Sequence, residues 1–198
     1  LLVMKNIIQA MQSDTPFALA TVISRNGSAP RSAGAKMLVR ADGSSVGTVG
    51  GGALEAQVQQ LALEVIRRPR AVVQSFAFSG KDAAAMDAIC GGQVEVLVEC
   101  VDPADPASAA LLQALAQAAA SHSRAWLVSG LPPHGAHALV GAEEILAGSL
   151  PDGLSAEEVR ETCLPQVRGA ALVEPLHTGG KAFIFGAGHV SRALAQFT

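Results

Sequence analysis

The chain has 198 residues, of which 49% are hydrophobic and 16% charged, and its net charge is −3. These values are typical of a compact globular protein and exclude a disordered chain. Aromatic residues make up 4% and Tyr is absent, which argues against a stacking platform for single-stranded nucleic acid. Residues 1–70 hold eight Lys or Arg and four Asp or Glu, so an anionic ligand is favoured in that part of the chain.

No feature of the sequence indicates secretion or a membrane. The N-terminus lacks the order of charged, apolar and small residues that marks a signal peptide, and no apolar run reaches the roughly 18–20 residues that span a bilayer. Three cysteines, Cys90, Cys100 and Cys163, are too few and too scattered for a disulfide framework. We therefore expect a cytoplasmic protein with reduced thiols, and neither membrane nor nucleic-acid partners.

The first hundred residues predict an α/β domain with a mixed sheet, which we bound at residues 1–102. Apolar spacing predicts a first helix at 3–11. Five strands are predicted, at 17–24, 36–40, 45–49, 71–78 and 93–101. The last strand alternates between two faces, one formed by Val94, Val96 and Val98 and the other by Glu95, Leu97 and Glu99.

Two glycine-rich loops lie within this domain. The first, residues 26–35, reads N-G-S-A-P-R-S-A-G-A, and its glycines and Pro30 exclude a helix or strand. The second, residues 47–52, reads G-T-V-G-G-G. It leads into a predicted helix from Ala53 to about Arg68, which the following proline ends.

Residues in and beside these loops are candidates for binding an anion. Gly50, Gly51 and Gly52 leave bare amides at a helix N-terminus, where the helix dipole favours a phosphate. Arg31 is either a bidentate partner of a phosphate or carboxylate, or a solvated surface residue. Glu55 in the first helical turn interacts with the dipole or hydrogen-bonds a ligand. The glycines can equally serve a tight turn, and the absence of a following G-K-[ST] argues against a P-loop.

The second half of the chain predicts a middle α/β segment, which we bound at residues 103–180. The sequence D-P-A-D-P at 102–106 is the break between the two parts. Asp105 is expected to cap a helix at 107–121, and Ser155 and Glu158 form a capping box for a second helix. Strands are predicted at 125–129 and 170–175, with a loop over 130–137.

Residues 181–198 predict the start of a Rossmann-like unit. A buried strand over residues 182–185 enters G-A-G-H-V-S, in which Gly186 and Gly188 hold the first two glycine positions and Ser191 replaces the third. A complete dinucleotide site needs on the order of a hundred further residues, including an acidic ribose ligand. We therefore expect a C-terminal unit that is cut short at the end of this chain.

Four sequence pieces in this order carry a resemblance to a known family. They are G-S-A-P-R-S-A-G-A-K-M-L-V-R-A-D-G, G-T-V-G-G-G-A-L-E, A-I-C-G-G-Q-V-E-V and F-I-F-G-A-G-H-V-S-R-A-L-A. Together they resemble the xanthine dehydrogenase accessory proteins of the XdhC/CoxI family. The resemblance covers the chain to about Cys100 and again from about Ala182.

The resemblance implies a maturation chaperone more than a free-standing enzyme, and we assign no catalytic residue. It implies binding of the molybdenum cofactor, support of its sulfuration, and delivery to an apo molybdenum hydroxylase of the xanthine dehydrogenase type. A cysteine desulfurase and a second copy of the chain are further expected partners. The complete C-terminal unit of such proteins is Rossmann-like, which adds a dinucleotide as a second cofactor.

Cys90 is the cysteine with the clearest functional interpretation. It precedes Gly91 and Gly92 in a predicted loop, and a thiol beside a flexible backbone suits metal ligation or persulfide handling. A small buried hydrophobic residue is the alternative. With the resemblance, Cys90 is placed near the metal or its sulfur, the loop glycines at the pterin phosphate, and Glu55 at the pterin ring.

The remaining candidates are interpreted as structural or surface residues. Lys36 and Arg40 share one face of a strand, which we take as a solvated face. The five histidines are taken as surface or loop residues, because none has enough neighbouring ligands for a metal. Cys100 and Cys163 are taken as structural.

Two other functions remain open from the sequence. An NAD(P)-dependent oxidoreductase built on the Gly186 turn would need an acidic ribose ligand beyond Thr198. A cofactor-free scaffold for a partner enzyme would use the glycines only as turns.

Overall fold

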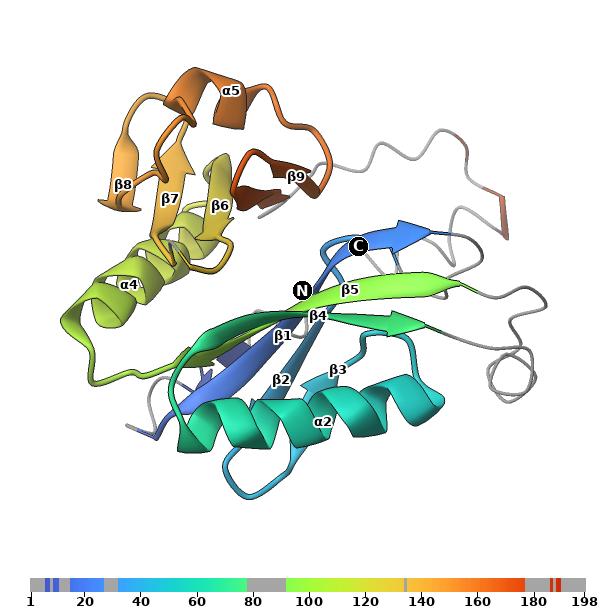
Figure 1. Cartoon of the computed structure of the whole chain (residues 1–198). Helices are drawn as coiled ribbons and strands as arrows, with labels where there is room; N and C mark the ends of the chain where they lie inside the picture. Colours follow the sequence, from blue (N-terminus) through green and yellow to red (C-terminus); the bar gives the residue numbers. More distant parts are fainter. Residues whose placement is uncertain are drawn as a thin grey trace.

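A computed structural model of the chain describes residues 6–7, 9–10, 15–26, 32–77, 92–133, 135–176, 186 and 188–189. It contains two five-stranded sheets, and every described pair of neighbouring strands is antiparallel. The two sheets lie one above the other in Figure 1.

The N-terminal sheet has the strand order β3-β2-β1-β5-β4. Its strands are β1 (Phe17–Asn26), β2 (Lys36–Arg40), β3 (Ser45–Gly47), β4 (Ala71–Ala77) and β5 (Gln93–Val101). A β-bulge between Val22 and Ser24 shifts the pairing of β1 with β5. Val22 therefore lies on one face of the sheet, whereas Ser24 shares the opposite face with Glu95.

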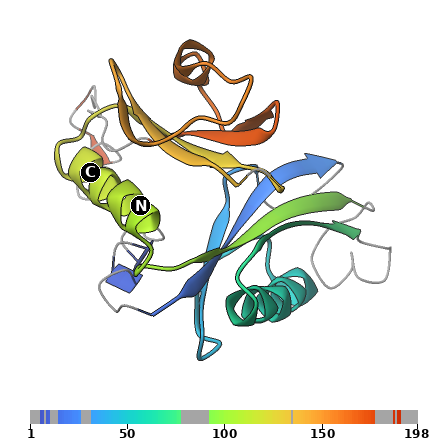
Figure 2. The same ribbon diagram turned by 60° about the vertical axis from the view of Figure 1, so that its left-hand side comes forward.

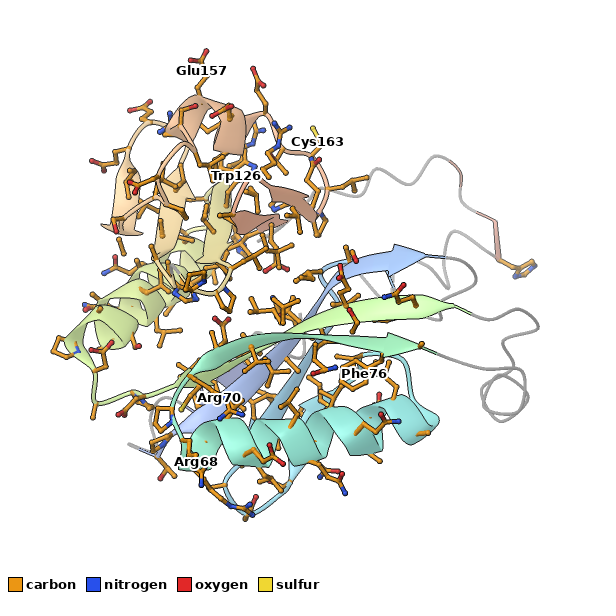
Figure 3. The ribbon with its side chains drawn as sticks, viewed as in Figure 1. Arg68, Arg70, Phe76, Trp126, Glu157 and Cys163 are labelled. Atoms are coloured by element: carbon orange, nitrogen blue, oxygen red, sulfur yellow. The ribbon has the colours of Figure 1, made fainter. Side chains whose placement is uncertain are left out.

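Helix α2 (Gly52–Arg67) covers one face of the N-terminal sheet. Its buried residues, Leu54, Val58, Ala62 and Val65, recur at intervals of three or four and so form one stripe. They pack against residues of the strands that alternate toward α2, among them Ala18, Ala20, Met37, Phe76 and Val96. Figure 3 shows Phe76 between β4 and the helix. Full burial of each large aliphatic side chain contributes about 1.5–3 kcal/mol.

The C-terminal sheet has the strand order β8-β7-β6-β10-β9. Its strands are β6 (Ala125–Gly130), β7 (His137–Gly141), β8 (Ile145–Gly148), β9 (Gln166–Arg168) and β10 (Ala171–Leu176). The short helix α5 (Ala156–Arg160) packs on its outer face with Trp126, Val128 and Val140. Trp126 donates a hydrogen bond from its indole nitrogen to the carbonyl of Thr162.

The two sheets meet along a second hydrophobic core, which we call the seam. Phe17, Leu19 and Leu38 of the N-terminal sheet pack in this core with Leu127 and Leu139 of the C-terminal sheet. Helix α4 (Pro106–Ala120) adds Leu112, Leu115 and Ala118 to it, and Figure 2 shows the helix beside both sheets. Asp105 caps α4 by accepting from the Ser108 amide at 2.9 Å, as the sequence predicts.

The α/β class predicted from the sequence is confirmed, with one correction. The N-terminal sheet was expected to be mixed, but its described strands pair only in antiparallel fashion. Three of these four pairings join strands that are consecutive in the chain or separated only by a loop, an arrangement that needs no crossover helix. Strands β7, β8 and β9 are not predicted. They are five, four and three residues long, and β8 and β9 carry no clear apolar alternation. The predicted division of the chain into residues 1–102, 103–180 and 181–198 stays a prediction. Most of the predicted start of a Rossmann-like unit lies outside the described residues.

Within the described residues, no helix combines the length and the apolar character needed to cross a membrane.

Candidate functional site

The seam carries a row of polar residues among its leucines. Each lies in phase with apolar residues that face the opposite sheet, so its side chain points into the seam. The set is Thr21, Lys36, Glu99, Ser129, His137 and Glu174, from strands β1, β2, β5, β6, β7 and β10 respectively. Four of the six, Thr21, Glu99, Ser129 and Glu174, are 6% exposed or less. Buried polar groups require partners, and Lys36 and His137 provide them for Thr21, Glu174 and Glu99.

Lys36 joins the two sheets on one side of the seam. Its ammonium lies 2.7 Å from Glu174 Oε2 and donates a second hydrogen bond to Thr21 Oγ1 at 2.9 Å. The side chains of Lys36 and Glu174 are only 10% and 5% exposed. The interpretation of Lys36 as part of a solvated face is therefore wrong, because Lys36 is in phase with the seam residue Leu38.

His137 and Glu99 form a second pair across the seam. Here the N-terminal sheet supplies the acidic partner and the C-terminal sheet supplies the basic one. His137 Nε2 lies 2.7 Å from Glu99 Oε2, and Nδ1 lies 2.8 Å from the carbonyl oxygen of Gly135. Both partner atoms are acceptors, so both ring nitrogens donate when the imidazole is protonated. The prediction of a surface or loop histidine is therefore wrong for His137, which begins β7 and pairs across the seam.

The surroundings of His137 favour its charged form. Burial acts to lower the pKa of His137, but the hydrogen bond and negative charge of Glu99 and the carbonyl of Gly135 outweigh burial and the opposing charge of Lys36. The net result is a raised pKa. The N-terminal sheet thus supplies a cation and an anion to the seam, and the C-terminal sheet supplies the matching anion and cation.

A cavity of about 600 Å³ opens beside these pairs. Its lining comes from α4, from the seam face of both sheets and from the ends of β7 and β8, and it includes Lys36, Glu99 and His137. The volume lies within the range of small-molecule sites in proteins. Cys100 also lines the cavity, and burial, together with the charge of Asp102, raises the pKa of its thiol. Cys100 is therefore a neutral wall residue rather than a reactive thiolate.

The predicted glycine loop forms a tight turn at the start of α2. Gly50, Gly51 and Gly52 have φ angles of 152°, 87° and 56°, a backbone that only glycine adopts readily. The Gly51 amide donates to Glu55 Oε1 at 3.0 Å, and the Thr48 hydroxyl donates to the same carboxylate oxygen. The Gly50 amide donates to Thr48 Oγ1 at 3.2 Å. An internal carboxylate thus occupies the position that the sequence assigns to an anion.

The strands that precede the segments containing Arg31 and Cys90 finish at the same end of the N-terminal sheet. Asn26 and Ala77 both pair with Gln93, so the ends of β1 and β4 and the start of β5 lie side by side. Arg31, Cys90 and Gly91 themselves lie outside the described residues, and their assignment stays a prediction. Gly92 is half-buried next to β5.

The described part of the chain gives the other predicted site residues few neighbours. Gly186 and Gly188 are exposed, with most of their neighbours outside the described residues. Cys163 is exposed near the end of α5 and points away from the sheet (Figure 3). Among the described residues, no three His, Cys, Asp or Glu side chains are grouped so that they could hold a metal ion.

Comparison with known proteins agrees with the sequence resemblance. Residues 10–77 match the model of the XdhC and CoxI family. The predicted resemblance is thereby confirmed over the segment that holds both glycine loops and α2. The match ends at the last residue of β4, so it does not include Glu99, His137 or Glu174.

Two similar proteins extend this comparison. An uncharacterized protein of Escherichia coli K12, YqeB, is 43% identical over 89 residues, which are 44% of this chain and 16% of YqeB. A solved structure described as a xanthine dehydrogenase from Bacillus halodurans has a TM-score of 0.68 at 23% identity, and the match covers 87% of this chain and 52% of that one. The similarity to the Bacillus halodurans structure shows a shared fold, and the matched part covers most of this chain. The chain spans about a sixth of YqeB and about half of the solved structure.

Proposed function

We propose that this chain is part of an accessory protein that binds the molybdenum cofactor, supports its sulfuration and delivers it to an apo molybdenum hydroxylase. The observation that carries the proposal is the match of residues 10–77 to the XdhC and CoxI family. A shared fold with a protein described as a xanthine dehydrogenase is consistent with it. The cofactor is cargo in this proposal, and the hydroxylase performs the chemistry after delivery.

The donors at the start of α2 fit the phosphate of such a cargo. The Gly51 amide and the Thr48 hydroxyl already converge on one anionic oxygen, and the space in front of Gly51 is open, since a Cβ there would meet no atom within 4 Å. Because Glu55 holds this position, a phosphate must displace its carboxylate. Arg31 and Cys90, from the segments that follow β1 and β4, complete the proposed site; both strands finish at the same end of the sheet.

Retention of the cofactor by the purified chain tests this proposal. The chain is mixed with molybdenum cofactor and separated from free cofactor, and the bound pterin is oxidised and measured by fluorescence. We expect stoichiometric retention by the wild type and loss of retention in Gly51→Leu. Gly43→Leu is the matched control, because Gly43 has a similar φ of 85° and equally open space but lies in the β2–β3 turn.

Equal folding of the two leucine variants, checked by circular dichroism, makes the comparison valid. A wild type that retains no cofactor overturns the proposed function. Equal retention by both variants overturns the assignment of the glycine loop while leaving the function in place.

A further inference from the structure

Strand β4 is the longest edge strand among the described strands. It has seven residues and pairs on one side with β5, whereas the other edge strands, β3, β8 and β9, have three or four residues. No described strand pairs with its other side, which we call the free edge. Its sequence, A-V-V-Q-S-F-A, contains no charged residue and no proline, and its pairing with β5 has no bulge. These are the devices that usually protect an edge, so the free edge favours pairing with a further strand.

The register shows which backbone groups of β4 face the free edge. The Cys100 amide donates to the Arg70 carbonyl, so the even-numbered residues of β4 direct their backbone groups at β5. Val73 and Ser75 therefore direct their N–H and C=O groups away from β5. The side-chain amide of Gln74 donates to the Ser75 carbonyl at 3.0 Å, in an exposed contact that agrees with this direction. Donors and acceptors at alternate residues are what an added strand needs.

Three arginines lie where β4 begins. Arg67 and Arg68 end α2, Arg70 directly precedes β4, and all three are exposed. Figure 3 shows Arg68 and Arg70 near this end of the helix. The three arginines line a hollow of about 360 Å³, to which Glu64 contributes the one carboxylate among the described lining residues. We call this the arginine hollow.

The charges of the arginine hollow are not balanced. Glu64 approaches Arg70 only to 4.0 Å, and within the described part of the chain neither Arg67 nor Arg68 forms an ion pair. The C-terminal end of a helix carries roughly half a negative charge, so it offsets only part of the excess positive charge. Guanidinium groups bind carboxylates through paired hydrogen bonds. The hollow therefore favours a ligand with more than one carboxylate.

We propose that the free edge of β4 binds an extended segment of a partner protein, whose acidic residues contact Arg67, Arg68 and Arg70. The segment adds a strand to the N-terminal sheet through the backbone groups of Val73 and Ser75. One occupant accounts for both features, because the arginine hollow leads directly into β4. A second copy paired through its own β4 would bring no carboxylate from that strand, and a free phosphate would leave the edge unpaired.

A synthetic peptide tests the proposal on the wild-type chain. The probe is a short labelled peptide of alternating threonine and valine that ends in a run of glutamates, and the control peptide has lysines in their place. Fluorescence anisotropy measures binding, and amide hydrogen exchange followed by NMR locates the peptide. We expect saturable binding of the acidic peptide alone, weakened by salt. Exchange should slow at the Val73 and Ser75 amides and stay unchanged at Val72 and Gln74, which already face β5.

Two variants test the edge and the hollow separately, each with a matched control. Val73→Pro removes an outward amide, and Val73→Thr retains it. Arg67→Gln with Arg68→Gln removes two charges from the hollow, and Arg40→Gln with Arg124→Gln removes two charges outside its lining. Binding should weaken about tenfold or more in Val73→Pro and in the Arg67 and Arg68 double variant. It should be unchanged in the two controls, with equal folding checked by circular dichroism.

The exchange measurement decides the proposal even when Val73→Pro does not fold, because it uses the wild type. An acidic peptide that does not bind, or that binds without slowing exchange at Val73 and Ser75, overturns the proposal. Displacement of the peptide by inorganic phosphate, with these amides unprotected, identifies a free-anion site instead. A wild-type dimer that Val73→Pro abolishes, with no peptide binding, identifies a second copy as the occupant and also overturns the proposal. None of these measurements uses the molybdenum cofactor, so their outcome is independent of the proposed function.

Discussion

Lys36 and Glu174 lie 138 residues apart in the chain, and their charged groups are 2.7 Å apart across the seam. The lysine comes from the second strand of one sheet, and the glutamate comes from the last described strand of the other. Both side chains are at least nine-tenths buried. The pair therefore links the two halves of the fold at a position where an unpaired charge is costly.

Lys36→Met is expected to destabilise the protein by about 3–5 kcal/mol, because it leaves the Glu174 carboxylate buried without its cation. The double variant Lys36→Met with Glu174→Leu is expected to recover most of that loss, since it removes both charges. Urea unfolding of the wild type, both single variants and the double variant forms the cycle that measures the coupling. Equal destabilisation by the single and double variants would contradict the importance of the pair.

The contribution of His137 to stability is expected to fall with rising pH. Its pKa is raised in the folded protein, so the protonated form stabilises the fold fully below the unfolded pKa of about 6.5. The contribution is lost as the pH rises through the folded value. The difference in urea midpoint between the wild type and His137→Gln, measured from weakly acidic to alkaline pH, should shrink over this window. A difference that stays constant would show that His137 does not titrate against Glu99.

Glu55→Ala is expected to lower stability by roughly 1–3 kcal/mol, the range for leaving a partly buried hydrogen-bonding group without its partner. The variant leaves the Gly51 amide and the Thr48 hydroxyl without their shared acceptor. Glu64→Ala in the same helix is the control, because the contact of Glu64 with Arg70 is 4.0 Å long and both side chains are exposed. Thermal unfolding should separate the two variants, and an equal change in both would argue against a stabilising role of the hydrogen bonds to Glu55.

Gly148→Ala is expected to destabilise the protein more than Gly153→Ala does. Both glycines have positive φ, 74° and 78°, so the backbone strain of an alanine is similar at the two positions. A Cβ at Gly148 would lie 1.9 Å from the carbonyl oxygen of His137, whereas at Gly153 it would meet nothing within 4 Å. The difference in unfolding free energy therefore measures this close approach. Imidazole NMR signals of His137 should move only in Gly148→Ala.

Local patterns in the sequence predict much of this fold. The stripe of α2, the two faces of β5, the Asp105 cap and the Ser155 capping box all depend on residues within a few positions of one another. The seam pairs do not, because they join residues separated by 38 and 138 positions. A single sequence contains no signal for which strands of two different sheets will face each other.

One signal for the seam was nevertheless present. Lys36 lies two residues before Leu38, and Glu99 lies two residues after Leu97. Each charged residue therefore shares a strand face with a fully buried leucine. A charged residue in phase with such leucines favours a paired buried position as much as a solvated face. His137 is harder to predict, because only the structure places it at the first position of a strand.

The exchange of charges across the seam has a consequence for how the chain can vary during evolution. Positions 36 and 174 form one compatible set, and positions 99 and 137 form another, so substitutions should occur together within each set among relatives. A chimera joined between β5 and α4 would combine the first half of one relative with the second half of another. Such a chimera should fold only when both halves carry matching charges at these four positions.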